Sequence, residues 1–333
     1  MYRIHFGIKD LYQFALHVWP GKPKYTEHDY PDLSGRVYIV TGAAGIGYEA
    51  TRLLLGQGAK VYLAVRSDAR GQECVRRLLA EFKDAAVDYF VIDLAEPATI
   101  GPGVAKFLRQ ETVLHGVLQN AGVMCPPRGA KTSSGLELQL GTNNVGSHVL
   151  QTYLDPILLR TAAKEPRGTV RVVWVTSSVH MFTDVRGGIN WDDLAYERAA
   201  WAPLAVLYCQ SKAMNIYQAH MWAKKHDADD AGVISLAVHP GNLRTSLDRH
   251  ITSVYSFGFH NLCFHPPKHG AYTELYALLS PTLTPERNNG SYIVPWGATG
   301  RIRPDIEEGM KGANGERVWS WLEEQAAPYL ASK

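Results

Sequence analysis

Three glycines stand between an apolar run and a predicted helix near the start of the chain. Gly42, Gly45 and Gly47 follow the apolar run Val37–Val40, and a helix is predicted over 46–56. Glycine has no Cβ, so it permits a tight turn and lets another group approach the backbone closely. A strand, a glycine-rich turn and a helix in this order form the first half of a βαβ unit, which constrains the fold more than any other feature.

The alternation of short apolar runs with helical stretches continues along the chain. Further segments are predicted as strands at 60–65, 89–92, 114–118, 170–175 and 233–238, and as a helix at 71–82. Such alternation implies parallel strands with right-handed crossovers, and nearly continuous apolar strands imply helices on both faces. We therefore predict an α/β chain with a single-domain Rossmann fold, whose doubly wound, mostly parallel sheet has about seven strands.

The length of the chain limits the number of domains, and its net charge argues against nucleic acid as a partner. The chain has 333 residues, 34 Lys+Arg and 32 Asp+Glu, and a formal net charge of +2. Near-neutral charge without a basic run argues against binding to nucleic acid. Length alone suggests about two domains. The motifs follow one sheet pattern, however, so we predict one domain over 34–299, an extension over 1–33 and a helical tail over 300–333.

Cysteine usage and hydropathy point to a compartment. Cys74, Cys125, Cys209 and Cys263 are widely spaced and form no CxxC pair, which fits free thiols in a reducing compartment. No apolar run reaches the ~18 residues of a membrane span. The first residues, MYRIHFGIKD, lack the order of a secretory signal. We expect a cytoplasmic protein without a transmembrane segment, and a homodimer is left open.

The glycine turn suits a dinucleotide. Gly45 lets the backbone approach a pyrophosphate, and Gly47 lets the helix pack closely on the strand. Ile46 opens the helix, whose N-terminal amides and dipole favour negative charge. The spacing is GxxGxG rather than GxGxxG, and a tight turn without a ligand is the alternative. The context favours a cofactor site at Gly42, Gly45, Ile46 and Gly47.

The end of the second predicted strand indicates which dinucleotide is used. NAD-binding folds place an acidic residue there to hold the ribose hydroxyls, but here Val65 is followed by Arg66. A guanidinium can pair with a 2′-phosphate, which favours NADP(H) over NAD(H). In the alternative interpretation Arg66 is a solvated charge and Asp68 reaches the ribose.

Tyr208 and Lys212 lie one turn apart in a segment with helical periodicity, so they share a helix face. An ammonium beside a phenol lowers the phenol pKa from ~10 toward neutral pH. Such a tyrosine can act as general acid or base on a carbonyl/alcohol pair. The pair is common in unrelated chains, so the prediction depends on the motifs around it.

The motifs are TGAAGIG (41–47), Asp93-Leu94, Asn120-Ala121-Gly122, NNVG with Asn143, VTSSVH with Ser178, YCQSK (208–212) and the segment 239–245. They follow one another as they do in the short-chain dehydrogenase/reductase family, which the chain resembles over about residues 34–299. The resemblance implies a catalytic set made of Asn143, Ser178, Tyr208 and Lys212. Ser177 is adjacent to Ser178, and a register shift by one residue is the alternative. The resemblance also implies that the cofactor is bound by Asp93, Leu94, Asn120, Ala121, Gly122, Tyr208, Lys212, Pro240, Gly241, Leu243 and Thr245.

The resemblance further implies a mechanism. Tyr208 would protonate the alkoxide formed by hydride transfer, and Ser178 would donate a hydrogen bond to the same oxygen. Lys212 would bind the nicotinamide ribose, and Asn143 would hold a water that relays protons from Lys212 to solvent. The chain departs from the family pattern at two positions. Gln119 replaces an asparagine, and Ala44 stands where NADP-preferring members often carry a basic residue.

Longer segments resemble one branch of the family. PDLSGRVYIVTGA, VYLAVRS and GAYTELYALLSP are similar to the retinol-dehydrogenase and WW-domain-oxidoreductase branch, and YIVPWGATGR with VWSWLEEQAAPYL to its fungal members. This implies a ketoreductase or alcohol dehydrogenase of specialised metabolism that acts on a small apolar carbonyl or alcohol. A non-redox isomerase or cyclase, or a non-catalytic nucleotide-binding protein, is the alternative on the same fold.

Three segments that fall outside the strand–helix repeat carry further predictions. The helical spacing of Leu11, Phe14, Ala15, Val18 and Trp19 favours packing on the protein itself, with peripheral membrane contact as the alternative. The aromatic segment 246–267 would form a substrate lid, with plain packing or a dimer contact as the alternative. The segment 181–203, with Trp191 and Trp201, would flank the same pocket. No metal site is predicted, because the histidines match no ligand motif; they are His250, His260, His265 and His269.

Overall fold

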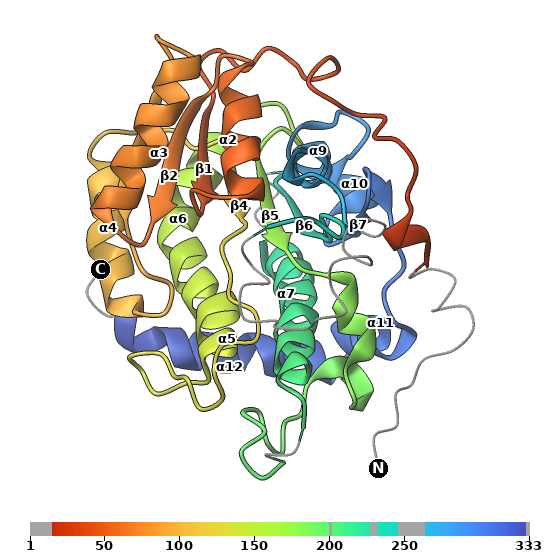
Figure 1. Cartoon of the computed structure of the whole chain (residues 1–333). Helices are drawn as coiled ribbons and strands as arrows, with labels where there is room; N and C mark the ends of the chain where they lie inside the picture. The colour runs from red at the N-terminus through yellow and green to blue at the C-terminus, as the bar shows by residue number, and fades with distance from the viewer. Residues whose placement is uncertain (1–14, 200–201, 227–231, 246–263, 331–333) are drawn as a thin grey trace.

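The computed structural model describes residues 15–199, 202–226, 232–245 and 264–330 (Figure 1). Its centre is one sheet with strand order β3-β2-β1-β4-β5-β6-β7-β8. In chain order the strands are β1 (Val37–Thr41), β2 (Lys60–Val65), β3 (Val87–Val91), β4 (Gly116–Gln119), β5 (Arg171–Val175), β6 (Ile234–Val238), β7 (Tyr292–Val294) and β8 (Ala298–Thr299). Neighbouring strands are parallel except β8, which pairs antiparallel with β7.

The strand order reverses between β1 and β4. β2 and β3 lie on one side of β1, and β4 to β7 follow on the other. In doubly wound sheets, ligands bind at the carboxyl ends of the strands where the order reverses. The predicted α/β Rossmann fold with a mostly parallel sheet is confirmed, and the antiparallel β8 extends the expected seven strands to eight.

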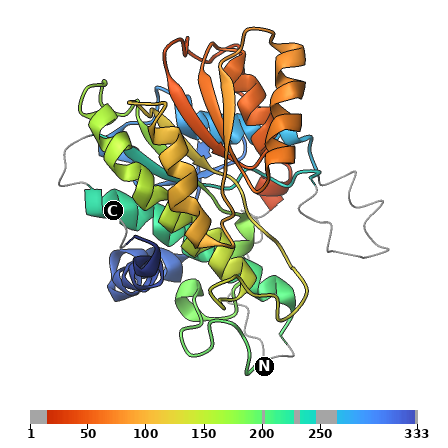
Figure 2. The ribbon, with the colours of Figure 1, turned by 90° about the vertical axis from the view of Figure 1, so that its left-hand side faces the viewer.

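Helices cover both faces of the sheet (Figures 1 and 2). One face carries α2 (Ile46–Leu55), α3 (Asp68–Glu81) and α9 (Pro267–Leu279). The other carries α4 (Ile100–Leu108), α6 (Ser147–Ala162) and α7 (Leu204–His226). The shorter or later helical segments are η1 (Pro97–Thr99), α5 (Leu138–Leu140), η2 (Gly141–Gly146), η3 (Ser178–Phe182), η4 (Arg186–Gly188), α10 (Pro285–Asn288), α11 (Pro304–Lys311) and α12 (Ala313–Leu330).

Three predicted starts shift by two or three residues, and one of them is that of β4, which begins at Gly116 rather than at 114. β3 begins at Val87 rather than at 89, because it is a half-buried edge strand in which Asp88 interrupts the apolar run. α3 begins at Asp68 rather than at 71, and a carboxylate in the first turn complements the helix dipole.

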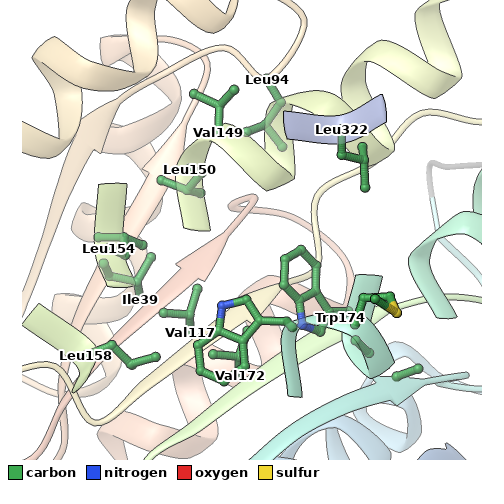
Figure 3. Packing of buried hydrophobic residues seen from close by; sticks show 14 of the residues in the cluster. Ile39, Leu94, Val117, Val149, Leu150, Leu154, Leu158, Val172, Trp174 and Leu322 are labelled. Carbon is green, nitrogen blue, oxygen red and sulfur yellow. The ribbon is translucent and has the colours of Figure 1, made fainter. Parts of the chain in front are cut away.

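Alternate residues of each strand enter opposite cores. In β1, Val37 and Ile39 face the core under α4, α6 and α7, whereas Tyr38 and Val40 face the core under α2 and α9. Both sets are apolar because helices cover both faces. Figure 3 shows the first core, in which the sheet residues Ile39, Val117, Val172 and Trp174 meet Leu150, Leu154 and Leu158 of α6.

The C-terminal helices extend this first core. Val318, Leu322 and Ala326 of α12 are fully buried in the cluster that includes α6 and α7. In Figure 1, α12 crosses the lower ends of both of these helices, and it contacts both. Among the described helices, none combines the length and the apolar character needed to cross a membrane.

Candidate active site

The turn after β1 requires its glycines for two different reasons. Gly42 and Gly45 have φ values of 90° and 58°, which side chains other than glycine rarely adopt. A Cβ on Gly47 would lie 2.5 Å from the carbonyl oxygen of Gly42 and 2.7 Å from Nδ2 of Asn120. α2 begins at Ile46 and its N-terminus has no side-chain cap. The first amides of this helix are thus available to an anionic ligand.

The segment after β4 is tied to this turn. Nδ2 of Asn120 donates to the carbonyl of Thr41 at 2.8 Å, and the amide of Ala121 donates to Oγ1 of Thr41 at 2.8 Å. A Cβ on Gly122 would lie 2.9 Å from Oδ1 of Asn143 and 3.7 Å from Nζ of Lys212. Asn120, Ala121 and Gly122 therefore connect the glycine turn to two predicted catalytic residues.

The segment after β6 reaches over the same turn. A Cβ on Gly45 would lie 3.3 Å from Cγ2 of Thr245. Leu243 packs against Gly270 of α9, which also borders Ile46. Gly241 has a φ of 105° and stands where any Cβ would meet the ring of Trp296. This path brings Thr245 and Leu243 beside the glycine turn; that they bind a cofactor stays a prediction.

Three further residues predicted to bind the cofactor are Pro240, Asp93 and Leu94. The carbonyl oxygen of Pro240 accepts a hydrogen bond from Oγ1 of Thr273. Asp93 follows β3, and its Oδ1 accepts the amide of Ala95 at 2.9 Å. Leu94 is buried in the core beside Gly146. Asp93 is therefore held in one orientation by its own loop.

Arg66 and Asp68 differ in their availability. Arg66 is exposed at the end of β2 and forms no ion pair within the described ranges. Asp68 is the first residue of α3. One of its carboxylate oxygens accepts a hydrogen bond from the hydroxyl of Tyr89, and the other accepts one from the side-chain Nε2 of Gln72. The guanidinium is thus free to meet a ligand, whereas the carboxylate is already engaged.

The four predicted catalytic residues are all buried and come from three neighbouring elements. Tyr208 and Lys212 lie on α7, Ser178 is the first residue of η3 after β5, and Asn143 lies in η2, a π-helical turn before α6. Nζ of Lys212 is 5.6 Å from the ring centroid of Tyr208. η3 and η2 both pack against α7, so one end of the sheet gathers the whole set.

Side-chain bonds fix Asn143 in place. Its Oδ1 accepts the amide of Val123 at 2.8 Å, and its Nδ2 donates to the carbonyl of Val123 and to Oγ of Ser211, each at 3.0 Å. The amide group of Asn143 therefore joins the loop after β4 to α7.

Burial controls the electrostatics of the pair on α7. It lowers the pKa of Lys212 to about 8 and raises the pKa of Tyr208, with smaller upward contributions from Cys209 and Cys125. The sequence predicts that Lys212 lowers the pKa of Tyr208; the structure shows the opposite direction, because the buried phenol has lost the water that would stabilise its phenolate. Nearby Glu274 on α9 is also fully buried, and burial raises its pKa well above the usual range.

Comparisons with known proteins agree with this arrangement. A family model described as short chain dehydrogenase matches residues 36–179. A short-chain dehydrogenase/reductase of Phomopsis amygdali is 40% identical to this chain over 323 residues, which cover 94% of this chain and 96% of that protein. This chain belongs to the short-chain dehydrogenase/reductase family. Membership of this family supports an oxidoreductase. A second relative, the short-chain dehydrogenase/reductase pkfC of Emericella nidulans, is 37% identical over 92% of this chain and 98% of its own length.

Solved structures show the same fold. An uncharacterized protein from Mycobacterium paratuberculosis superposes on this short-chain dehydrogenase/reductase with a TM-score of 0.68 and 25% identity, over 91% of this chain and 97% of the other. The RhlG/NADP active-site complex of Pseudomonas aeruginosa gives 0.61 at 22% identity, over 81% and 98%. A 3-ketoacyl-(acyl-carrier-protein) reductase from Brucella melitensis complexed with NADH gives 0.59 at 20% identity, over 80% and 98%.

These relatives support the predicted fungal character of this short-chain dehydrogenase/reductase, because the curated proteins above come from fungi. Their names do not mention retinol dehydrogenases, so the predicted branch stays a prediction. Gln119, which departs from the family pattern, lies in the core, where its side-chain amide donates to Oε1 of Gln151 and to the carbonyl of Ser147. Ala44 is exposed in the glycine turn.

The C-terminal part of this short-chain dehydrogenase/reductase holds the segment that follows Ser178. The buried guanidinium of Arg303 donates hydrogen bonds to the carbonyls of Met181, Thr183 and Val185, and forms an ion pair with Asp305. Nε1 of Trp191 donates to Oδ1 of Asn314 at 2.6 Å. The described part of the predicted insert 181–203 is therefore anchored by residues from 303 onward; Trp201 lies outside the described residues.

The remaining predicted features are placed only in part. Val18 is buried, Ala15 is half-buried and Trp19 is 56% exposed, whereas Leu11 and Phe14 lie outside the described residues. The lid segment 246–267 is described only from 264 onward.

Histidines and cysteines show no reactive cluster in the described ranges. His265 and His269 stack on each other beside Trp296, and His250, His260 and Cys263 lie outside these ranges. No group of three metal-ligating side chains occurs within them. Burial raises the pKa of Cys209 to about 12, so this thiol is neutral.

Sequence reasoning missed one residue of the site. Asn215 lies on α7, and its Oδ1 accepts a hydrogen bond from Nζ of Lys212 at 3.3 Å. The signal was present, since residues three apart on a helix share a face. The hydrogen bond from its Nδ2 to the carbonyl of Asn143 depends instead on the packing of η2 against α7, and Asn143 is 72 positions away in the sequence.

Proposed function

We propose that this protein is an NADP(H)-dependent oxidoreductase that moves a hydride between nicotinamide and a carbonyl or alcohol carbon of a small apolar molecule. It would act as a ketoreductase or alcohol dehydrogenase of fungal specialised metabolism. The observation that carries this proposal is that the loop after β4 is bonded to the glycine turn and also borders Lys212, with Tyr208 one turn from Lys212 on α7. The fungal relatives support the metabolic context.

The chain's residues fit a nicotinamide dinucleotide. The turn at Gly42 and Gly45 leaves the backbone bare, the start of α2 lacks a cap, and Thr245 stands beside Gly45. When bound, the nicotinamide supplies or accepts the hydride. NADP- and NADH-bound structures occur among proteins of this fold, which is consistent with either cofactor.

The preference for NADP(H) depends on the end of β2. Arg66 is exposed and unpaired in the described chain, whereas the oxygens of Asp68 are engaged by Tyr89 and Gln72. A guanidinium can form charge-assisted hydrogen bonds with a 2′-phosphate. A ribose 2′-hydroxyl would need an acceptor such as Asp68, which would first have to give up a present partner.

Tyr208, Ser178 and Lys212 divide the work at the reacting oxygen. In reduction, the hydroxyl of Tyr208 donates its proton to the oxygen as negative charge grows there. Ser178 donates a hydrogen bond to the same oxygen and stabilises that charge in the transition state. The ammonium of Lys212 holds the nicotinamide ribose and favours the phenolate left on Tyr208. Oxidation uses the same groups in reverse.

The deciding experiment measures nicotinamide absorbance with purified protein, NADPH or NADH, and a panel of apolar ketones and aldehydes. We expect turnover with NADPH. Tyr208→Phe should lower kcat by about 100-fold or more, because a general acid typically contributes that much to the rate. Tyr217→Phe is the matched control. It removes a buried hydroxyl from the same helix, but that hydroxyl bonds Gly187 and Asn314. Equal activity in Tyr208→Phe and wild type would contradict the proposed chemistry.

A further inference from the structure

A buried polar network lies between α7 and the π-helical turn η2. Nζ of Lys212 donates to the carbonyl of Val175 at 2.8 Å and to Oδ1 of Asn215 at 3.3 Å. Nδ2 of Asn215 donates to the carbonyl of Asn143 at 2.8 Å and to Oε1 of Gln218 at 2.9 Å. One amide thus joins the ammonium of Lys212 to the backbone of Asn143.

The orientation of this amide is determined by its partners. Lys212 can only donate, so the atom of Asn215 that faces it must be the oxygen. The carbonyl of Asn143 can only accept, so the atom that faces it must be the nitrogen. A flipped amide would place donor against donor and acceptor against acceptor. Asn215, Lys212 and Asn143 are all buried, so each mismatched contact would lack water to relieve it.

The carbonyl of Asn143 already has a donor on the side of Lys212. It accepts Nδ2 of Asn215 at 2.8 Å, and it also lies 2.8 Å from Oγ of Ser147, whose single proton is shared with the carbonyl of Asn144. A relay water, which the family resemblance implies at this position, would have to bridge the same two groups that the amide of Asn215 already joins.

We propose that Asn215 is a positioning residue whose side-chain amide takes the place of the relay water between Lys212 and Asn143. The inference rests on the proposed oxidoreductase function. The amide orients the ammonium but passes no proton, because its nitrogen and oxygen would have to exchange hydrogens through an unstable tautomer. Two of the three N–H groups of Lys212 are held by Val175 and Asn215. The third is left for the nicotinamide ribose.

Three substitutions at Asn215 separate this role from packing. Asn215→Leu keeps the approximate shape and removes both bonds. Asn215→Asp keeps an oxygen for Lys212 and adds charge. Asn215→Ala opens a space lined by Lys212, Asn143 and Gln218, whose three polar atoms suffice to bind a water. Gln218→Met is the control, because Gln218 bonds Asn144 and Asn215 but not Lys212.

The first measurement is the dissociation constant of NADPH against pH, which needs no turnover. We expect Asn215→Leu to weaken binding about tenfold and to move the alkaline loss of binding to lower pH, because the ammonium loses an acceptor. Asn215→Asp should move it to higher pH, and Gln218→Met should leave it in place. Tyr208 on α7 and Glu274 on α9 are the titratable groups that also act on this region, and both are unchanged in all four variants.

The second measurement is kcat with NADPH and a ketone that the wild type reduces. We expect Asn215→Ala to retain at least several times the kcat of Asn215→Leu, because a water replaces the amide only in the smaller variant. Thermal unfolding of each variant shows that it is folded. The proposal is overturned if the Leu and Asp variants move the pH limb in the same direction, or if Gln218→Met moves it as far. A wild type that binds NADPH but reduces nothing would instead refute the proposed function, and the binding data would still test Asn215.

Discussion

Three buried histidines make the stability of this fold sensitive to mild acid. His17, His148 and His180 are each at most 3% exposed. Burial lowers the pKa of each from 6.5 to about 4, since no solvent stabilises the imidazolium. The unfolded chain therefore binds protons more strongly than the folded one. The free energy of unfolding should be constant well above pH 6.5 and fall as the pH drops from about 7 toward 4.

The magnitude follows from the two pKa values. At pH 5, a histidine with a pKa of 6.5 when unfolded and about 4 when folded contributes a loss of about 2 kcal/mol. Three such residues lose about 6 kcal/mol, which is comparable with the ~5–15 kcal/mol that stabilises an ordinary domain. Buried His239 acts in the same direction, and the raised pKa of Glu274 acts in the opposite one.

The assay is urea unfolding followed by tryptophan fluorescence at pH 8, 6 and 5. His148→Phe removes one titrating group while keeping a ring against Trp319, whose centroid is 4.9 Å away. This variant should lose about 2 kcal/mol less than the wild type between pH 8 and pH 5. His28→Gln, at an exposed position, should follow the wild type. A free energy of unfolding that is the same at pH 8 and pH 5 would refute the reasoning.

Three other substitutions test separate parts of the structure. Gly47→Ala places a Cβ 2.5 Å from a backbone oxygen, so it should weaken NADPH binding at least tenfold, as measured by fluorescence titration. Arg66→Ala should weaken NADPH binding about 10- to 100-fold and NADH binding less than twofold, and equal losses would contradict the preference for NADP(H). Arg303→Met leaves three backbone carbonyls and the half-buried Asp305 without the guanidinium, and should lower the free energy of unfolding by about 3–5 kcal/mol in urea.

The sequence predicts the elements whose signal is local. β1, the glycine turn and α2 were recognisable because an apolar run, positive-φ glycines and a helix start lie next to one another. The strand β7 has three residues and β8 has two. So short a run has no periodicity, and β7 is a strand because it pairs with β6 and β8.

The candidate site divides in the same way. Tyr208 and Lys212 share a helix turn, so their proximity follows from spacing alone. The second bond of Asn215, to the carbonyl of Asn143, joins residues 72 positions apart and depends on how η2 packs on α7. The engagement of Asp68 by Tyr89 likewise depends on the pairing of β2 with β3. Contacts of this kind arise from tertiary packing and leave no mark in the local sequence.

The anchoring of the segment after Ser178 by Arg303 and Asn314 has a consequence for the order of synthesis. The glycine turn, Ser178, Tyr208 and Lys212 all leave the ribosome before residue 303 exists. The backbone carbonyls of Met181, Thr183 and Val185 have no guanidinium to bind until that residue emerges. The loop after Ser178 can therefore reach this arrangement only after residue 303 has emerged, whereas β1 to β6 all precede that residue in the chain. A chain cut short before residue 303 should lack the guanidinium that holds this loop.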